Sequence, residues 1–364
     1  MDRLTPIPPI AGHHLLLVLI QTALLLFAAR LLGELSKRLG QPAVIGELLA
    51  GIVLGPSLLG WLAPNVFLAL FPREPAQFHL LELLGWLGMV LLMLLTGLET
   101  DVRRLRHLGR AATYASVLGM ILPFLFGWAF ARALPASYLQ PGADRGLFAT
   151  FFATAMAISA MPVIAKVLRD LEITGRDVGV LILTAGVVDD TAGWLVLSVI
   201  AGMVKGSFSA LRLLRTVALT GAFLVGAIVI LYPAARWLFR VVGDRFHTRD
   251  NDLTLAVVIA FLAAAATEAI GVHPVFGAFV AGCVLRQVPR LRHASLARLE
   301  SVGMAIFAPL FFGLVGLKVD LRAAGVFSTS AWLLTAALAM ATAGKLIGCT
   351  AGGLLGRLRF WEAL

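Results

Sequence analysis

Charged residues are scarce in this sequence, and their scarcity excludes a soluble fold. Asp, Glu, Lys and Arg make up 14% of the 364 residues, whereas hydrophobic residues make up 60% and the mean hydropathy is +0.93. One soluble core could not hide so many apolar side chains. Apolar runs of about twenty residues recur with short polar connections, and helices satisfy every backbone group inside lipid. The chain is therefore predicted to be an all-α polytopic membrane protein.

Other features are also scarce, and each scarcity excludes a class of protein. The chain has only two cysteines, Cys283 and Cys349, both in apolar segments, so no disulfide framework is expected. No cluster of His or Cys has the spacing of a transition-metal site. No long linker or soluble domain interrupts the apolar runs, so residues 1–364 are predicted to form a single transmembrane domain. The net charge of +10 is scattered over short loops, which argues against nucleic acid and leaves the lipid bilayer as the expected partner.

The apolar runs predict about eleven transmembrane helices. They lie near residues 13–32, 43–60, 79–98, 111–134, 147–168, 178–204, 213–240, 253–270, 272–286, 301–317 and 329–355. Lys and Arg are about twice as frequent in one set of alternate loops as in the other. Since positive loops face the cytoplasm, the N-terminus is predicted to lie outside the cell (inner) membrane and the C-terminus in the cytoplasm.

Two adjacent carboxylates, Asp189 and Asp190, lie near the middle of the apolar run at 178–204. An ionised Asp at bilayer depth costs roughly 2.5 to 3.5 kcal/mol on insertion scales, so the pair needs a partner, a cation or a proton. Lys345 is the only basic residue deep inside a predicted span and is the natural partner. Because neighbouring helical residues point about 100° apart, one Asp can meet Lys345 while the other faces a cavity.

A proline interrupts the fifth predicted span within AMAISAMP, residues 155–162. Proline removes a helical hydrogen bond, so a broken helix near 155–163 is expected, with a plain kink as the alternative. Backbone carbonyls at such a break, together with the Ser159 hydroxyl, could hold an ion. Oxygen ligands suit hard cations, so a monovalent cation competing with a proton for one carboxylate would suffice for exchange. Glu47 and Glu268 are weaker candidates, each as consistent with the membrane interface as with a cavity.

Five segments, taken together, resemble the second family of the monovalent cation:proton antiporter superfamily, which includes sodium/proton antiporters and potassium-efflux relatives. They are residues 41–56 (QPAVIGELLAGIVLGP), 95–101 (LTGLETD), 186–190 (GVVDD), 273–282 (HPVFGAFVAG) and 308–317 (APLFFGLVGL). Each alone would be weak, but the set covers most of the chain in a consistent order.

The resemblance implies an inverted-repeat helical bundle and a transporter with no catalytic residue and no cofactor. It implies that Asp190 carries the cation and the proton, that Asp189 pairs with Lys345, and that Ser159 lies at the broken helix. The Asp-Asp pair, in place of the Gln-Asp of the potassium-efflux branch, favours Na⁺ as the cation bound by Asp190. Related proteins are homodimers, so a homodimer is expected here.

One departure from the family pattern concerns the end of the chain. Relatives of this kind continue past the position of Lys345 with about two more helices, including a second broken helix. This sequence ends at Leu364, so either the domain is incomplete at its C-terminus, with the last two family helices missing, or its transport domain is unusual. The resemblance favours the incomplete domain.

Other functions remain open at the level of sequence. An inactive fragment or a non-transporting membrane sensor would carry the same apolar runs, and K⁺ efflux or K⁺:H⁺ antiport would use the same carboxylates. An intramembrane aspartyl protease also needs two membrane carboxylates, but it places them on separate helices, whereas Asp189 and Asp190 are contiguous.

Overall fold

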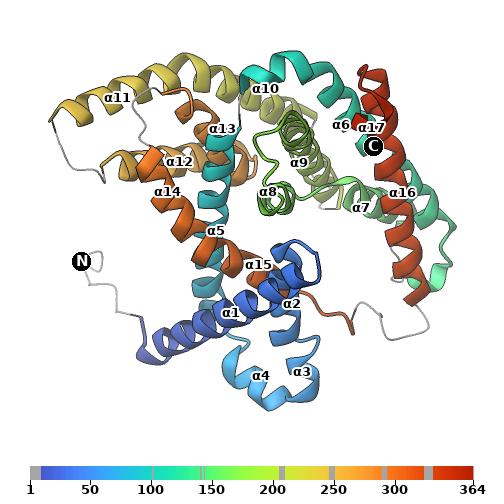
Figure 1. The fold of residues 1–364 in the computed structure, drawn as a ribbon. Helices are drawn as coiled ribbons and strands as arrows, with labels where there is room; N and C mark the ends of the chain where they lie inside the picture. The colour runs from blue at the N-terminus through green and yellow to red at the C-terminus, as the bar shows by residue number, and fades with distance from the viewer. Residues whose placement is uncertain are drawn as a thin grey trace, which may run out of the picture. The chain divides into compact units, whose positions relative to one another are not determined.

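The computed structural model describes residues 10–100, 102–139, 142, 144–204, 210–245, 251–288, 293–323 and 331–363. Within these ranges every regular element is helical (Figure 1). Ten described helical segments are long and apolar enough to cross a membrane, and a shorter apolar helix lies at Pro274–Leu285. The predicted class, an all-α polytopic membrane protein, is confirmed.

The helices are α1 (Gly12–Arg38), α2 (Ala43–Leu54), α3 (Leu59–Leu62), α4 (Pro64–Leu70), α5 (Pro75–Glu99), α6 (Val102–Ala133), α7 (Arg145–Ala157), α8 (Met161–Asp170), α9 (Asp177–Val204), α10 (Ala210–Gly226), α11 (Tyr232–Arg245), α12 (Asn251–Ile270), α13 (Pro274–Leu285), α14 (His293–Val302), α15 (Ala308–Leu317), α16 (Ala331–Leu355) and α17 (Phe360–Ala363). The predicted span at 272–286 differs most from expectation. It is the 12-residue α13. At 1.5 Å per residue this helix covers about 18 Å, only part of a hydrocarbon layer of about 30 Å.

Two π-helical turns join helices that would otherwise be interrupted by proline. They lie at Ala227–Leu231, between α10 and α11, and at Gly303–Phe307, between α14 and α15. Pro233 and Pro309 each follow two residues after such a turn. Because proline has no N–H and its ring collides with the preceding turn, a locally wider helix accommodates it. The predicted span at 213–240 is therefore one continuous helical rod.

The part of the chain that the structure describes divides into two compact units. The smaller unit comprises Met1–Met89 and Ser301–Ala324, and the larger one Val90–Glu300 and Gly325–Leu364. In the smaller unit α1, α2 and α15 pack against one another. Glycines permit the close approach: a Cβ at Gly51 would lie within 1.9 Å of the carbonyl oxygen of Gly313.

In the larger unit α16 runs alongside α6 (Figure 1). Gly344, Gly348 and Gly352 recur every four residues and form one buried face of α16. A Cβ at Gly348 would lie 2.4 Å from the carbonyl oxygen of Leu118 on α6. Because these glycines let the two backbones touch, they also fix the position of the neighbouring Lys345.

Basic residues at the end of α8 have acidic partners within the fold. Lys166 is buried and its Nζ lies 3.0 Å from Oδ1 of Asp170, one turn further along α8. The guanidinium of Arg169 forms ion pairs with Glu99 of α5 and Glu300 of α14, all within the larger unit. Lys166 is thus more deeply buried than Lys345, because α8 turns its basic face inward.

The substitution Gly348→Ala should lower the melting temperature, although alanine is the better helix former. The added methyl group would lie 2.4 Å from a backbone oxygen of α6, and overpacking of this kind costs about 1–3 kcal/mol. Gly221→Ala on α10 is the matched control, since nothing lies within 4 Å of its Cβ, and its melting temperature should hold or rise. Thermal unfolding of the purified protein in detergent measures both. A Gly348→Ala variant as stable as the wild type would contradict the close packing of α6 and α16.

Candidate functional site

A broken helix forms the centre of the candidate site. Helix α7 ends at Ala157, α8 begins at Met161, and residues 158–160 between them are not helical. Ile158 and Ala160 have extended backbone angles, and Pro162 occupies the first turn of α8, where the missing N–H costs nothing. The predicted broken helix near 155–163 is confirmed, and the chain is unwound there instead of merely kinked.

Two glycines on α9 allow the broken helix to approach the acid pair. A Cβ at Gly193 would lie 2.3 Å from Cγ1 of Ile158, and one at Gly186 would lie 3.2 Å from Cδ1 of Ile164. These positions lie four residues before and three residues after Asp190, so all three share one face of the helix. The break therefore packs on α9 where the carboxylates lie.

Asp190 faces the start of α8. Met161, the first residue of that helix, and Asp190 line the same small cavity, of about 10 Å³. A helix N-terminus carries unpaired N–H groups and the positive end of the helix dipole, so it attracts a negative charge. A cavity of that size has room for about one water molecule or a bare monovalent ion.

Asp189 points to different partners. Its Oδ2 lies 2.7 Å from Nζ of Lys345 on α16, and its Oδ1 accepts a hydrogen bond of 2.7 Å from Oγ of Ser116 on α6. The Asp189 side chain is 6% exposed and that of Lys345 is 25% exposed. Both carboxylate oxygens of Asp189 are therefore engaged by neighbouring helices, so the two adjacent acids have separate surroundings.

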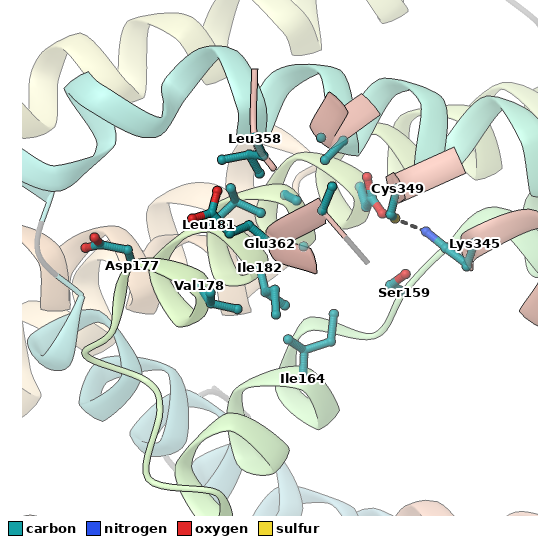
Figure 2. Close-up of a pocket in the computed structure, with 16 residues that line it drawn as sticks. Ser159, Ile164, Asp177, Val178, Leu181, Ile182, Lys345, Cys349, Leu358 and Glu362 are labelled. Carbon is teal, nitrogen blue, oxygen red and sulfur yellow. Dashed lines mark hydrogen bonds and ion pairs between the residues drawn. The ribbon is translucent and has the colours of Figure 1, made fainter. Parts of the chain in front are cut away.

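A larger cavity, of about 510 Å³, brings together Ser159, Asp189 and Lys345. In Figure 2 Ser159, Lys345 and Cys349 lie on one side of this cavity, while Asp177 lies on the other. Asp190 is not among its lining residues and opens instead onto the small cavity. Of the candidates from the sequence, Asp189, Lys345 and Ser159 thus share one space, and Asp190 has another.

The weaker acidic candidates lie elsewhere in the described structure. Glu47 is buried, at 2% exposure, in α2 of the smaller unit. Glu268 lies in α12 with an exposed side chain, whereas the preceding Thr267 is 1% exposed. Because consecutive helical residues point about 100° apart, the inward position of Thr267 turns Glu268 outward. Neither acid lines the cavity of Asp189 or that of Asp190.

Two residues of the site were not selected from the sequence. Ser116 is a buried hydroxyl in the apolar part of α6, a position that signals a hydrogen-bond partner without naming it. His273 lies in the connection between α12 and α13 and lines the small cavity with Asp190. Its Nδ1 accepts the N–H of Val275 at 3.4 Å and so caps α13.

The sequence of this chain matches a protein family and several known proteins. A family model described as "Sodium/hydrogen exchanger, transmembrane" matches residues 23–363. The Na⁺/H⁺ antiporter NhaS4 of Synechocystis sp. is 33% identical over 319 residues, covering 85% of this chain and 75% of that protein. Cation/H⁺ antiporter 18 of Arabidopsis thaliana is 32% identical over 96% of this chain, which spans 42% of the plant protein's length.

A solved structure shares the fold at much lower sequence identity. The sodium proton antiporter MjNhaP1 from Methanocaldococcus jannaschii superposes with a TM-score of 0.66, at 16% identity, over 96% of this chain and 81% of that one. The likeness supports the fold alone. The family follows from the sequence matches: with residues 23–363 covered by the family model and a relative 33% identical over most of both chains, this protein belongs to the sodium/hydrogen exchanger family.

Proposed function

We propose that this chain exchanges a monovalent cation for H⁺ across a membrane by alternating access, and that Asp190 binds each in turn. The observation that carries the proposal is the position of the Asp190 carboxylate, beside the N-terminus of α8 and on a cavity with room for about one ion. The names of the relatives, a Na⁺/H⁺ antiporter and a cation/H⁺ antiporter, support it.

Competition at one carboxylate explains how a cation and a proton can be coupled. When Asp190 is ionised, its negative charge and its carboxylate oxygens attract a hard cation. When Asp190 is protonated, the negative charge that holds the cation is gone, so the two ligands exclude each other. If the carboxylate faces the two sides of the membrane alternately, this exclusion is sufficient for exchange.

Asp189 and Lys345 have a structural role in this proposal. Both oxygens of Asp189 are already hydrogen-bonded or ion-paired, so Asp189 joins α6, α9 and α16. The opposite charge of Lys345 compensates that of Asp189, which leaves Asp190 as the group whose occupancy changes. The fixed pair thus keeps the second carboxylate available for transport.

Finer assignments belong to the same proposal. Na⁺ is the first choice of cation and K⁺ the alternative. The protein acts in the cell (inner) membrane as a homodimer, with its N-terminus outside and its C-terminus in the cytoplasm. It is a transporter without catalytic residues and without a cofactor, and the cation and proton are its substrates.

The substitution Asp190→Asn should abolish exchange, because an amide neither ionises nor attracts a cation by charge. The purified chain is reconstituted in liposomes with a pH gradient and a pH-sensitive dye, and Na⁺, Li⁺ and K⁺ are added in turn. The wild type should dissipate the gradient with at least one of these cations, and the cation that acts at the lowest concentration identifies the substrate.

Asp144→Asn is the matched control for this assay. It makes the same chemical change at an exposed N-cap of α7, where asparagine caps a helix as well as aspartate does, so exchange should be unchanged. Exchange that persists in Asp190→Asn would disprove the assignment of the carrier. A wild-type chain that gives no response to any of the three cations would disprove transport by this chain.

The substitution Lys345→Ala should destabilise the protein, because it leaves the buried Asp189 without its opposite charge. Breaking a buried ion pair from one side costs about 3 kcal/mol or more, whereas removing both charges costs far less. The double variant Asp189→Asn/Lys345→Ala should therefore melt at a higher temperature than Lys345→Ala alone. If Lys345→Ala melts like the wild type at neutral pH, the pair does not stabilise the fold.

A further inference from the structure

Three side chains with metal-binding atoms meet in the smaller unit, at the start of α1. His13 and His14 lie in the first turn of that helix, and Glu74 lies directly before α5. One ligand atom from each lies within 4.8 Å of the others, and the two imidazole centroids are 3.9 Å apart. We propose that His13, His14 and Glu74 bind a divalent transition-metal ion of the Zn²⁺ type.

A buried chain of hydrogen bonds fixes the tautomer of His14. The carbonyl oxygen of Leu70 can only accept a hydrogen bond. The Gln21 side-chain atom in contact with it must therefore be Nε2, which donates. The Oε1 atom of Gln21 consequently accepts from Nε2 of Gln77, at 3.0 Å. The remaining atom of the Gln77 amide, Oε1, lies 2.9 Å from Nδ1 of His14, which must therefore donate.

These hydrogen bonds hold His14 in the tautomer that can bind a metal ion through Nε2. With the proton held on Nδ1, the lone pair of His14 is on Nε2, the nitrogen that remains for a ligand bond. Oε2 of Glu74 lies 3.8 Å from Nδ1, so the Glu74 side chain must rotate toward Nε2 to share an ion with it. Metal-binding histidines commonly donate their other N–H to an oxygen acceptor, which fixes the ring orientation and increases the basicity of the ligand nitrogen. Gln21 and Gln77 are each 1% exposed, so this orientation is held by the core of the unit.

The donor set indicates the kind of metal. Two imidazole nitrogens and one carboxylate oxygen suit Zn²⁺ and its neighbours, whereas Na⁺, K⁺ and Mg²⁺ prefer oxygen ligands only. Tetrahedral Zn²⁺ holds its ligand atoms roughly 3.3 Å apart, so the side chains must close by about an ångström. His13 is exposed and the Glu74 side chain is 59% exposed, which leaves both free to rotate and lets the ion enter from solution.

The site would join two segments that are distant in the sequence. His13 and His14 belong to α1, and Glu74 belongs to the connection that leads into α5. A bound ion would therefore tie the first turn of α1 to the start of α5 and stabilise the folded form by mass action. No spacing along the chain reveals this cluster, because Glu74 is distant from the two adjacent histidines in the sequence and meets them only in the fold.

The test uses the full chain purified without a polyhistidine tag. Zn²⁺ is titrated into the protein in detergent at neutral pH by calorimetry, and Co²⁺ serves as a spectroscopic probe of nitrogen and oxygen ligands. The wild type should bind about one Zn²⁺ per chain at this site, with a rise in melting temperature. His13→Ala, His14→Ala and Glu74→Gln should each weaken Zn²⁺ binding at least about tenfold.

Matched variants separate this site from unspecific binding. His79→Ala removes an exposed histidine outside the cluster and should leave Zn²⁺ affinity unchanged. Gln77→Met removes the acceptor of the His14 proton and should weaken binding about tenfold while all three ligands remain. The proposal is overturned if the wild type binds no Zn²⁺, or if the double variant His13→Ala/His14→Ala binds Zn²⁺ as the wild type does. Both histidines lie at the surface end of α1, so the metal-free variants should melt near the wild-type temperature. That result shows that the variants fold.

Discussion

Two carboxylates can be neighbours inside an apolar helix only if each has its own partners to compensate its charge. The larger unit is organised around that constraint. Asp189 is held by Ser116 and Lys345, which come from α6 and α16. Asp190, turned about 100° around α9, faces the N-terminus of α8 across a small cavity. Were both acids to share one environment, repulsion and desolvation would destabilise the fold.

The packing of the helices around the acid pair keeps the partners of Asp189 and Asp190 apart. Gly348 and Gly352 bring α16 against α6, so that Lys345 reaches Asp189, while Gly193 admits Ile158 and brings the break onto α9. The break itself exposes the N-terminus of α8 at the depth of the acid pair, where an intact helix would offer only satisfied backbone groups. Local sequence features, glycine spacing and one proline, thus determine where the charges lie.

Much of this arrangement could be predicted from the sequence, because lipid imposes strict rules. Apolar runs predicted the helices, Pro162 predicted the break, and the cost of burying charge singled out Asp189, Asp190 and Lys345. Features that depend on packing between distant helices could not be predicted. They are the hydrogen bond of Ser116 to Asp189, the burial of Lys166 and the exposure of Glu268. The length of α13 was also missed, since hydropathy alone does not locate the ends of a helix.

The central claim is that one carboxylate binds a cation or a proton but never both. Cation binding to the purified protein in weakly buffered detergent solution, with a pH indicator present, tests it most directly. About one proton released per cation bound, with an apparent cation affinity that falls as the solution is made more acidic, is the predicted result. Cation binding without proton release, at an affinity independent of pH, would contradict the claim.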